Sequence, residues 1–223
     1  MGDWIELTAK DGHKLKAYEA PPSGESKGAV VLLQEIFGVN GHIRRVADDY
    51  AGRGYHVVAP ALFDRVARDV ELGYDSESIA KGRDLRQRIA LEAVLDDIQA
   101  AINRAGESGK VAVIGYCWGG SLAFLAATRL DGLACAVGYY GAMIAQHKGE
   151  RTRVPTILHF GERDSSIPMS DVEAVQRAHP DMSIFTYPAG HGFNCDARKD
   201  YDAQQADLAL QRTLRFIAEK LTK

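Results

Sequence analysis

Short apolar runs rich in β-branched residues alternate along the chain with longer segments whose apolar residues recur at helical spacing. The short runs predict buried strands at residues 29–33, 56–59, 111–114, 134–140, 156–160 and 184–187. The longer segments predict helices at residues 43–53, 84–104, 121–127 and 202–220. Strands that alternate with helices favour a mostly parallel α/β sheet with helices on both faces.

Two segments depart from this alternation. Near the start of the chain, Asp11-Gly12 separates two segments that mix apolar and charged residues, 5–7 and 15–18, which predicts an opening antiparallel hairpin. Residues 64–83 begin as a polar, irregular stretch and are expected to form a surface excursion. Without an internal repeat or a linker, we expect one domain over residues 1–223.

Composition and charge exclude several classes of protein. Of the 223 residues, 46% are apolar, which is enough for a sizeable core. The net charge is −3, and the 27 basic and 30 acidic residues are spread along the chain without a block of like charge. We therefore expect neither nucleic-acid nor membrane binding. Three cysteines are too few for a disulfide framework, and the start of the chain has no signal-peptide pattern, so the cytoplasm is the expected location. We expect the protein to be a monomer or a small homo-oligomer.

The most informative motif is Gly115-Tyr116-Cys117-Trp118-Gly119-Gly120, which lies between a predicted strand and a predicted helix. This is the nucleophile elbow of α/β-hydrolases, with Cys117 in place of serine. Side chains at Gly115 and Gly119 would clash in so tight a turn, and Cys117 would meet the N-terminus of a helix. The alternative is that Cys117 is an inert, buried cysteine.

Two further residues follow predicted strands in the order that such hydrolases use. Asp164 follows the strand that ends at residue 160, and His191 follows the strand that ends at residue 187. A histidine can accept the thiol proton, and an aspartate can orient the imidazole. Taken singly, Asp164 is equally a helix cap or turn residue, and His191 equally a loop residue.

Glu35 follows the strand at 29–33, where hydrolases place an oxyanion donor, and it alternatively pairs with Arg44 or Arg45. We expect no metal centre and no cofactor, because no metal-ligand spacing or nucleotide-binding motif is present. Metal-ligand spacing is absent among the six other histidines, which are His13, His42, His56, His147, His159 and His179.

Together these segments resemble the dienelactone hydrolase (carboxymethylenebutenolidase) family of the α/β-hydrolases. The resemblance rests on six segments that span nearly the whole chain: residues 34–40, 54–60, 115–120, 137–141, 161–164 and 190–193. It implies an α/β-hydrolase fold and a cysteine hydrolase acting on a small ester or lactone. It assigns the nucleophile to Cys117, the acid to Asp164 and the base to His191.

The resemblance also implies further site residues. It sets Glu35 against the cysteine and makes the backbone N–H groups of Ile36 and Trp118 the oxyanion donors. A carboxylate beside a thiol opposes thiolate formation, so we hypothesise that Glu35 holds the resting thiol neutral and takes its proton when substrate displaces it. The candidates for contact with substrate are Arg83, Arg86, Arg88, Phe37 and Phe193.

The chain departs from the family at one place. Dienelactone-specific members carry an arginine shortly after the histidine, whereas here none occurs until Arg198. We therefore expect activity on neutral esters and weak preference for a substrate carboxylate.

The alternatives are a general carboxylesterase or thioesterase of the same family and a non-catalytic binding protein on this fold. A class I glutamine amidotransferase would need a glutamate at position 193, which is Phe.

Overall fold

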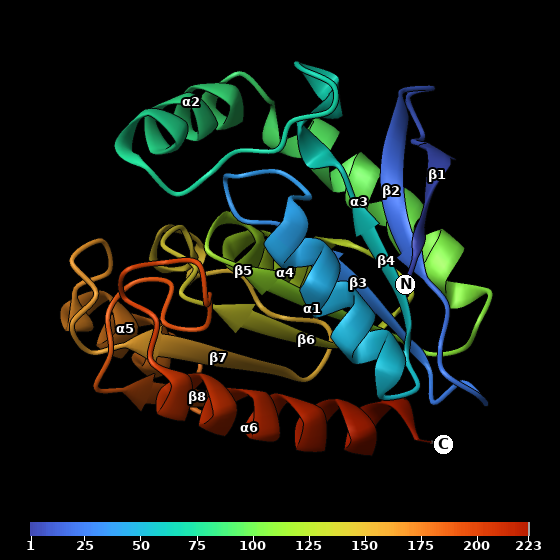
Figure 1. Ribbon diagram of the computed structural model, residues 1–223. Coiled ribbons are helices and arrows are strands. Elements are labelled where there is room, and N and C mark those ends of the chain that lie inside the picture. The colour runs from blue at the N-terminus through green and yellow to red at the C-terminus, as the bar shows by residue number, and fades with distance from the viewer. Residues whose placement is uncertain (223) are drawn as a thin grey trace.

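One eight-stranded sheet organises the computed structural model, which describes residues 1–222 (Figure 1). Its strand order is β1-β2-β4-β3-β5-β6-β7-β8. The β1–β2 and β2–β4 pairs are antiparallel and all other pairs are parallel, as the predicted hairpin and mostly parallel sheet require. The strands are β1 Asp3–Thr8, β2 Lys14–Ala20, β3 Ala29–Leu33, β4 His56–Pro60, β5 Val111–Tyr116, β6 Leu133–Tyr139, β7 Thr156–Gly161 and β8 Ser183–Tyr187.

Helices cover both faces of the sheet, as predicted. They are α1 Gly41–Gly52, α2 Ser76–Gln87, α3 Leu91–Gly106, α4 Trp118–Arg129, α5 Met169–Ala178 and α6 Ala203–Leu221, with 3-10 turns at Leu62–Arg65 and Ile144–His147. Apolar residues of α1 and α6 join one buried cluster, and those of α3 and most of those of α4 join the other. In Figure 1, α1 and α6 lie in front of the sheet, with α3 and α4 behind it.

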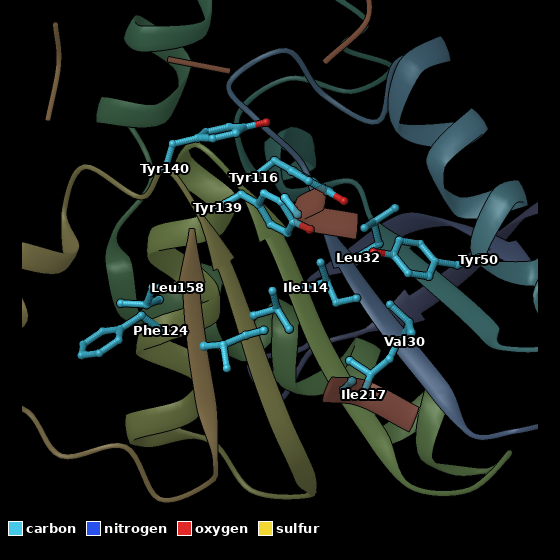
Figure 2. Packing of buried hydrophobic residues seen from close by; sticks show 14 of the residues in the cluster. Val30, Leu32, Tyr50, Ile114, Tyr116, Phe124, Tyr139, Tyr140, Leu158 and Ile217 are labelled. Atoms are coloured by element: carbon cyan, nitrogen blue, oxygen red, sulfur yellow. The ribbon is translucent and has the colours of Figure 1, made fainter. Parts of the chain in front are cut away.

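The central strands are buried on both faces, which explains their continuous apolar runs. Alternate residues of β3 point to opposite sides: Val30 and Leu32 join the cluster with α1 and α6, whereas Val31 and Leu33 join the cluster with α3 and α4. Figure 2 shows Val30, Leu32 and Ile114 side by side along the strands, and the rings of Tyr116, Tyr139 and Tyr140 gathered nearby. The rings of Tyr116 and Tyr139 lie 4.7 Å apart.

The region before β5 differs from the prediction. In place of one helix at 84–104, the chain forms α2 and α3 and breaks between residues 87 and 91. The last part of the expected surface excursion, residues 76–83, is therefore helical. Asp75 caps α2 by accepting a hydrogen bond from the N–H of Ser78, which lies 2.9 Å away. The prediction failed because α2 has only two fully buried residues, Gly82 and Leu85, so its apolar periodicity is weak.

A series of buried hydrogen bonds links side chains of β6, β7, β8 and α6. The Nδ1 atom of His159 lies 2.7 Å from the Tyr187 hydroxyl, and its Nε2 atom lies 3.2 Å from the Thr213 hydroxyl. The Thr213 hydroxyl in turn lies 2.6 Å from that of Tyr139. Burial, and to a lesser degree the charge of Arg212, lower the pKa of His159 to about 3.

We expect this histidine to destabilise the protein in acid. In the unfolded chain His159 binds a proton near pH 6.5, whereas in the folded state it stays neutral down to about pH 3. Its contribution to the free energy of unfolding is therefore complete above pH 6.5. Between pH 6.5 and 3 that contribution falls as the pH falls, by at most about 1.4 kcal/mol per pH unit.

Urea unfolding at several pH values measures this slope in the wild type and in a His159→Gln variant, which carries no titrating group there. The variant is expected to be less stable at pH 7 but to lose less stability on acidification. Equal slopes for the two proteins would show that His159 makes no contribution.

Candidate active site

Cys117 lies at the sharp turn between β5 and α4, with φ 55° and ψ −113°. A non-glycine residue adopts this backbone conformation only when its surroundings enforce it. The surroundings are very tight, because a Cβ atom at Gly115 would lie 1.9 Å from the Gly119 carbonyl oxygen. A Cβ atom at Gly119 would lie 2.3 Å from the carbonyl oxygen of Leu33 in β3. Both predicted glycine requirements are therefore confirmed.

The structure brings Cys117, His191 and Asp164 into one hydrogen-bonded chain. The Nε2 atom of His191 lies 3.2 Å from the Cys117 sulfur, and its Nδ1 atom lies 2.6 Å from Oδ2 of Asp164. The other oxygen of Asp164 accepts a hydrogen bond from the N–H of Ser166, at 2.8 Å. This second bond holds the carboxylate in place, so that it can orient the imidazole ring toward the sulfur.

The surroundings favour the charged form of His191. Burial disfavours the imidazolium, but the hydrogen bonds to Asp164 and Cys117 outweigh it and raise the pKa of His191 above its usual range. The arrangement therefore supports a proton on both ring nitrogens when the sulfur is a thiolate.

Buried aromatic rings pack against His191 and its loop. Tyr140, at the unusual φ of 37°, sets its ring edge-on to the imidazole, with centroids 5.2 Å apart. Phe193 is fully buried and packs against Tyr140 and Tyr187, with centroid separations of 5.6 and 5.0 Å. We therefore correct the expected role of Phe193: it supports the loop in the core rather than contacting substrate.

The loop after β3 is bound directly to the elbow. The N–H of Gly119 donates to the Gln34 carbonyl oxygen, at 3.0 Å, which places residues 35 and 36 beside the first turn of α4. Trp118 is the first residue of α4, so its N–H has no acceptor within the helix. Within residues 1–222, the N–H of Ile36 makes no backbone hydrogen bond either. Both expected oxyanion donors thus flank Cys117.

Glu35 is buried in this loop but does not bind the thiol. Its Oε1 atom accepts a hydrogen bond from Nη1 of Arg198, at 2.8 Å, whereas the cysteine sulfur faces His191. This corrects the expectation that Glu35 contacts the Cys117 thiol in the resting protein. That Glu35 takes the thiol proton once substrate is bound stays a prediction. A guanidinium is a far stronger partner for a buried carboxylate than a neutral thiol. The alternative pairing with Arg44 or Arg45 is also wrong, since Arg44 pairs with Glu71 and Arg45 with Asp196.

Arg198 belongs to the site, although the sequence analysis assigned it no role there. Its side chain crosses the backbone of Gly192, where a Cβ atom would lie 2.6 Å from Cδ of Arg198. Burial opposes its charge, but the negative charge of the nearby Glu35 carboxylate raises the pKa of Arg198 further. The signal in the sequence was Gly192, because this glycine lets a side chain from seven residues beyond His191 return to the site.

The other substrate-contact candidates lie in or just after α2, apart from Phe37 in the loop after β3. Gly82 of α2 packs against the Ile36 carbonyl, so α2 covers the Glu35 loop. Arg86, one turn further along α2, is half-buried, whereas Arg83 is exposed. Arg88 is also exposed, and its guanidinium lies 3.7 Å from Asp84.

Phe37 is buried, with its ring against Tyr74 and under the Arg198 guanidinium, so it positions Arg198.

Comparison with known proteins agrees with this geometry. The sequence model of the dienelactone hydrolase family matches residues 15–221. A putative carboxymethylenebutenolidase of a Synechocystis strain is 36% identical over an aligned length of 213, and the alignment covers 86% of each chain. A carboxymethylenebutenolidase of Pseudomonas putida is 33% identical over all of this chain and 99% of its own.

Solved structures show the same fold. A putative dienelactone hydrolase from Klebsiella pneumoniae superposes with a TM-score of 0.84 at 27% identity, covering 98% of this chain and 99% of its own. An esterase from Pyrococcus furiosus superposes with a TM-score of 0.72 at 14% identity, covering 99% and 92%. The sheet order, the elbow and these structures define an α/β-hydrolase. The chain belongs to the dienelactone hydrolase family and is a hydrolase of ester or lactone bonds.

In the part of the chain that the structure describes, no helix is long and apolar enough to cross a membrane.

The environments of the three cysteines predict one order of alkylation. Cys117 is partly exposed, whereas Cys135 and Cys195 are fully buried. Burial raises the pKa of Cys135 to about 12 and that of Cys195 to about 11. We expect iodoacetamide at pH 7.5 to modify Cys117 first, as read by peptide mass spectrometry over time. Modification of Cys135 or Cys195 ahead of Cys117 would contradict this reading.

Proposed function

We propose that the protein is a cysteine-dependent hydrolase of small esters or lactones that forms a thioester intermediate on Cys117. The observation that carries this proposal is the hydrogen-bonded chain from Asp164 through His191 to the elbow sulfur, with distances of 2.6 and 3.2 Å. A carboxylate, an imidazole and a thiol in this order are the parts that nucleophilic acyl transfer requires.

In the first half of the proposed reaction, the Cys117 sulfur attacks the carbonyl carbon of the ester and its proton resides on His191. The carbonyl oxygen becomes an oxyanion, which accepts hydrogen bonds from the N–H groups of Ile36 and Trp118. Such a donor typically contributes a factor of ~10²–10³ to the rate. The ester C–O bond then breaks, and the leaving alkoxide takes the proton from the imidazolium.

In the second half, water attacks the thioester carbon and gives a proton to His191. The carbon–sulfur bond breaks, the carboxylic acid leaves, and the sulfur and imidazole return to their starting state. Asp164 keeps the imidazole in one tautomer and stabilises the imidazolium in both halves. With a lactone substrate the alcohol stays attached to the acyl group throughout, so the hydrolysis of the thioester releases a single hydroxy acid.

The Glu35–Arg198 pair sets the expected charge preference of the site. Arg198 brings a cation close to Cys117, but Glu35 neutralises it through a direct hydrogen bond of 2.8 Å. A substrate carboxylate must therefore compete with Glu35 for the guanidinium. Neutral esters face no such competition, so we propose that they are substrates as well.

We expect Cys117→Ala to abolish ester hydrolysis, because within residues 1–222 no other nucleophilic side chain is hydrogen-bonded to His191. Initial rates on an aryl acetate measure this, with circular dichroism as the check on folding. Cys135→Ala is the matched control, and it is expected to retain activity because Cys135 lies within β6, away from the hydrogen-bonded chain. A folded Cys117→Ala protein with wild-type rates would overturn the proposed mechanism.

Charge preference can be measured with one ester in two forms, with a free carboxylate and with that carboxylate methylated. In the wild type we expect kcat/KM to favour the anionic form by less than ~100-fold, which corresponds to about 2.7 kcal/mol of transition-state binding. Glu35→Gln frees Arg198 and should raise this ratio about tenfold. Glu35→Gln combined with Arg198→Gln should bring the ratio back down.

The ratio of the two substrates cancels any effect of these changes on the cysteine itself. A Glu35→Gln ratio equal to that of the wild type would show that the pair does not control charge preference. A wild-type ratio well above ~100-fold would show that Glu35 does not neutralise the site.

A further inference from the structure

A second cluster of reactive side chains lies behind the Glu35 loop. Glu35, His42 and Cys195 each offer a potential ligand atom, and the three atoms lie within 4.8 Å of one another. The residues come from the loop after β3, the first turn of α1 and the loop after His191. All three are buried, with exposed fractions of 1%, 7% and 0%.

One carboxylate oxygen of Glu35 accepts no hydrogen bond from the described residues. While Oε1 binds Arg198, Oε2 is buried and has no hydrogen-bond partner among the described residues. A buried charged oxygen without a donor is costly, and such an atom calls for a specific explanation. A cation that binds Oε2 would satisfy it without removing Arg198 from Oε1.

His42 is oriented as metal-binding histidines usually are. Its Nδ1 atom lies 2.9 Å from Oδ1 of Asp196, and Arg45 holds the same oxygen at 3.1 Å. A carboxylate on one ring nitrogen fixes the tautomer and leaves the lone pair of Nε2 available to a metal.

We propose that Glu35, His42 and Cys195 form a site for a divalent transition-metal ion, with Zn²⁺ as the best fit. One oxygen, one imidazole nitrogen and one sulfur form a ligand set that Zn²⁺ accepts and that Mg²⁺ and Ca²⁺ do not. On binding, Cys195 releases its proton to solvent and its thiolate offsets one positive charge of the ion, while the Glu35 carboxylate is shared between the ion and Arg198. Water occupies the fourth position.

The spacing requires only a small adjustment. Zinc bonds of about 2.0–2.3 Å in a tetrahedron separate neighbouring ligand atoms by about 3.3–3.8 Å. Atoms that lie within 4.8 Å of one another must therefore move together by about 1.5 Å or less. Rotations of the three side chains provide such shifts without a change in backbone.

The test is made in a Cys117→Ala background, because Cys117 and His191 would themselves bind a soft metal. Co²⁺ and Zn²⁺ are titrated into this protein by calorimetry and, for Co²⁺, by absorbance. We expect one equivalent to bind, with a thiolate-to-cobalt charge-transfer band that a chelator removes. Adding Cys195→Ala should abolish the band and weaken binding at least tenfold, and adding His42→Ala should also weaken binding at least tenfold.

The matched control adds Cys135→Ala, which removes a buried thiol from a different place and should leave both the band and the affinity unchanged. Circular dichroism establishes that each variant is folded. Should Cys195→Ala fail to fold, His42→Ala, whose side chain lies at the start of α1, decides the question by its affinity. The proposal is overturned if the Cys117→Ala protein binds no metal, or if binding survives both the Cys195 and the His42 changes.

Discussion

The close approach of three backbone segments at the elbow is the constraint on which the rest of the site depends. Gly115 and Gly119 have no room for side chains, and the Gly119 N–H is bound to the Gln34 carbonyl oxygen. This contact joins β3, β5 and α4, and it forces Cys117 to the positive φ of 55°. A strained residue survives there because packing on every side determines its conformation. The sulfur, the first amides of α4 and the Glu35 loop consequently meet at one point.

Charge is distributed around this point so that each ion has a partner. Asp164 holds His191 and Glu35 holds Arg198, so each charged side chain near the cysteine is paired with one of opposite sign. In a buried site an unpaired charge would be costly, which explains why the thiol does not compete with Arg198 for Glu35. The exception is Oε2 of Glu35, which marks the boundary between the active site and the cluster with His42 and Cys195.

Much of the fold could be predicted without coordinates, and so could the three residues of the hydrogen-bonded chain in the site. Buried parallel strands carry continuous apolar runs, and the elbow is encoded locally by glycines around Cys117. Asp164 and His191 were found because the carboxyl ends of parallel strands meet at one edge of the sheet. The break between α2 and α3 was missed, since α2 buries little apolar surface and its pattern resembles that of a loop.

The sequence by itself determined all eight strands, most of the helices, the elbow, and the candidates Cys117, Asp164 and His191, because each of these follows from a local pattern or from chain order. Only the tertiary structure decided the partner of Glu35, which is Arg198, 163 positions away. It alone also brought His42 and Cys195 to the same carboxylate and placed Phe193 in the core. The physical reason is that such pairs depend on how loops pack and where long side chains reach, which local periodicity does not encode.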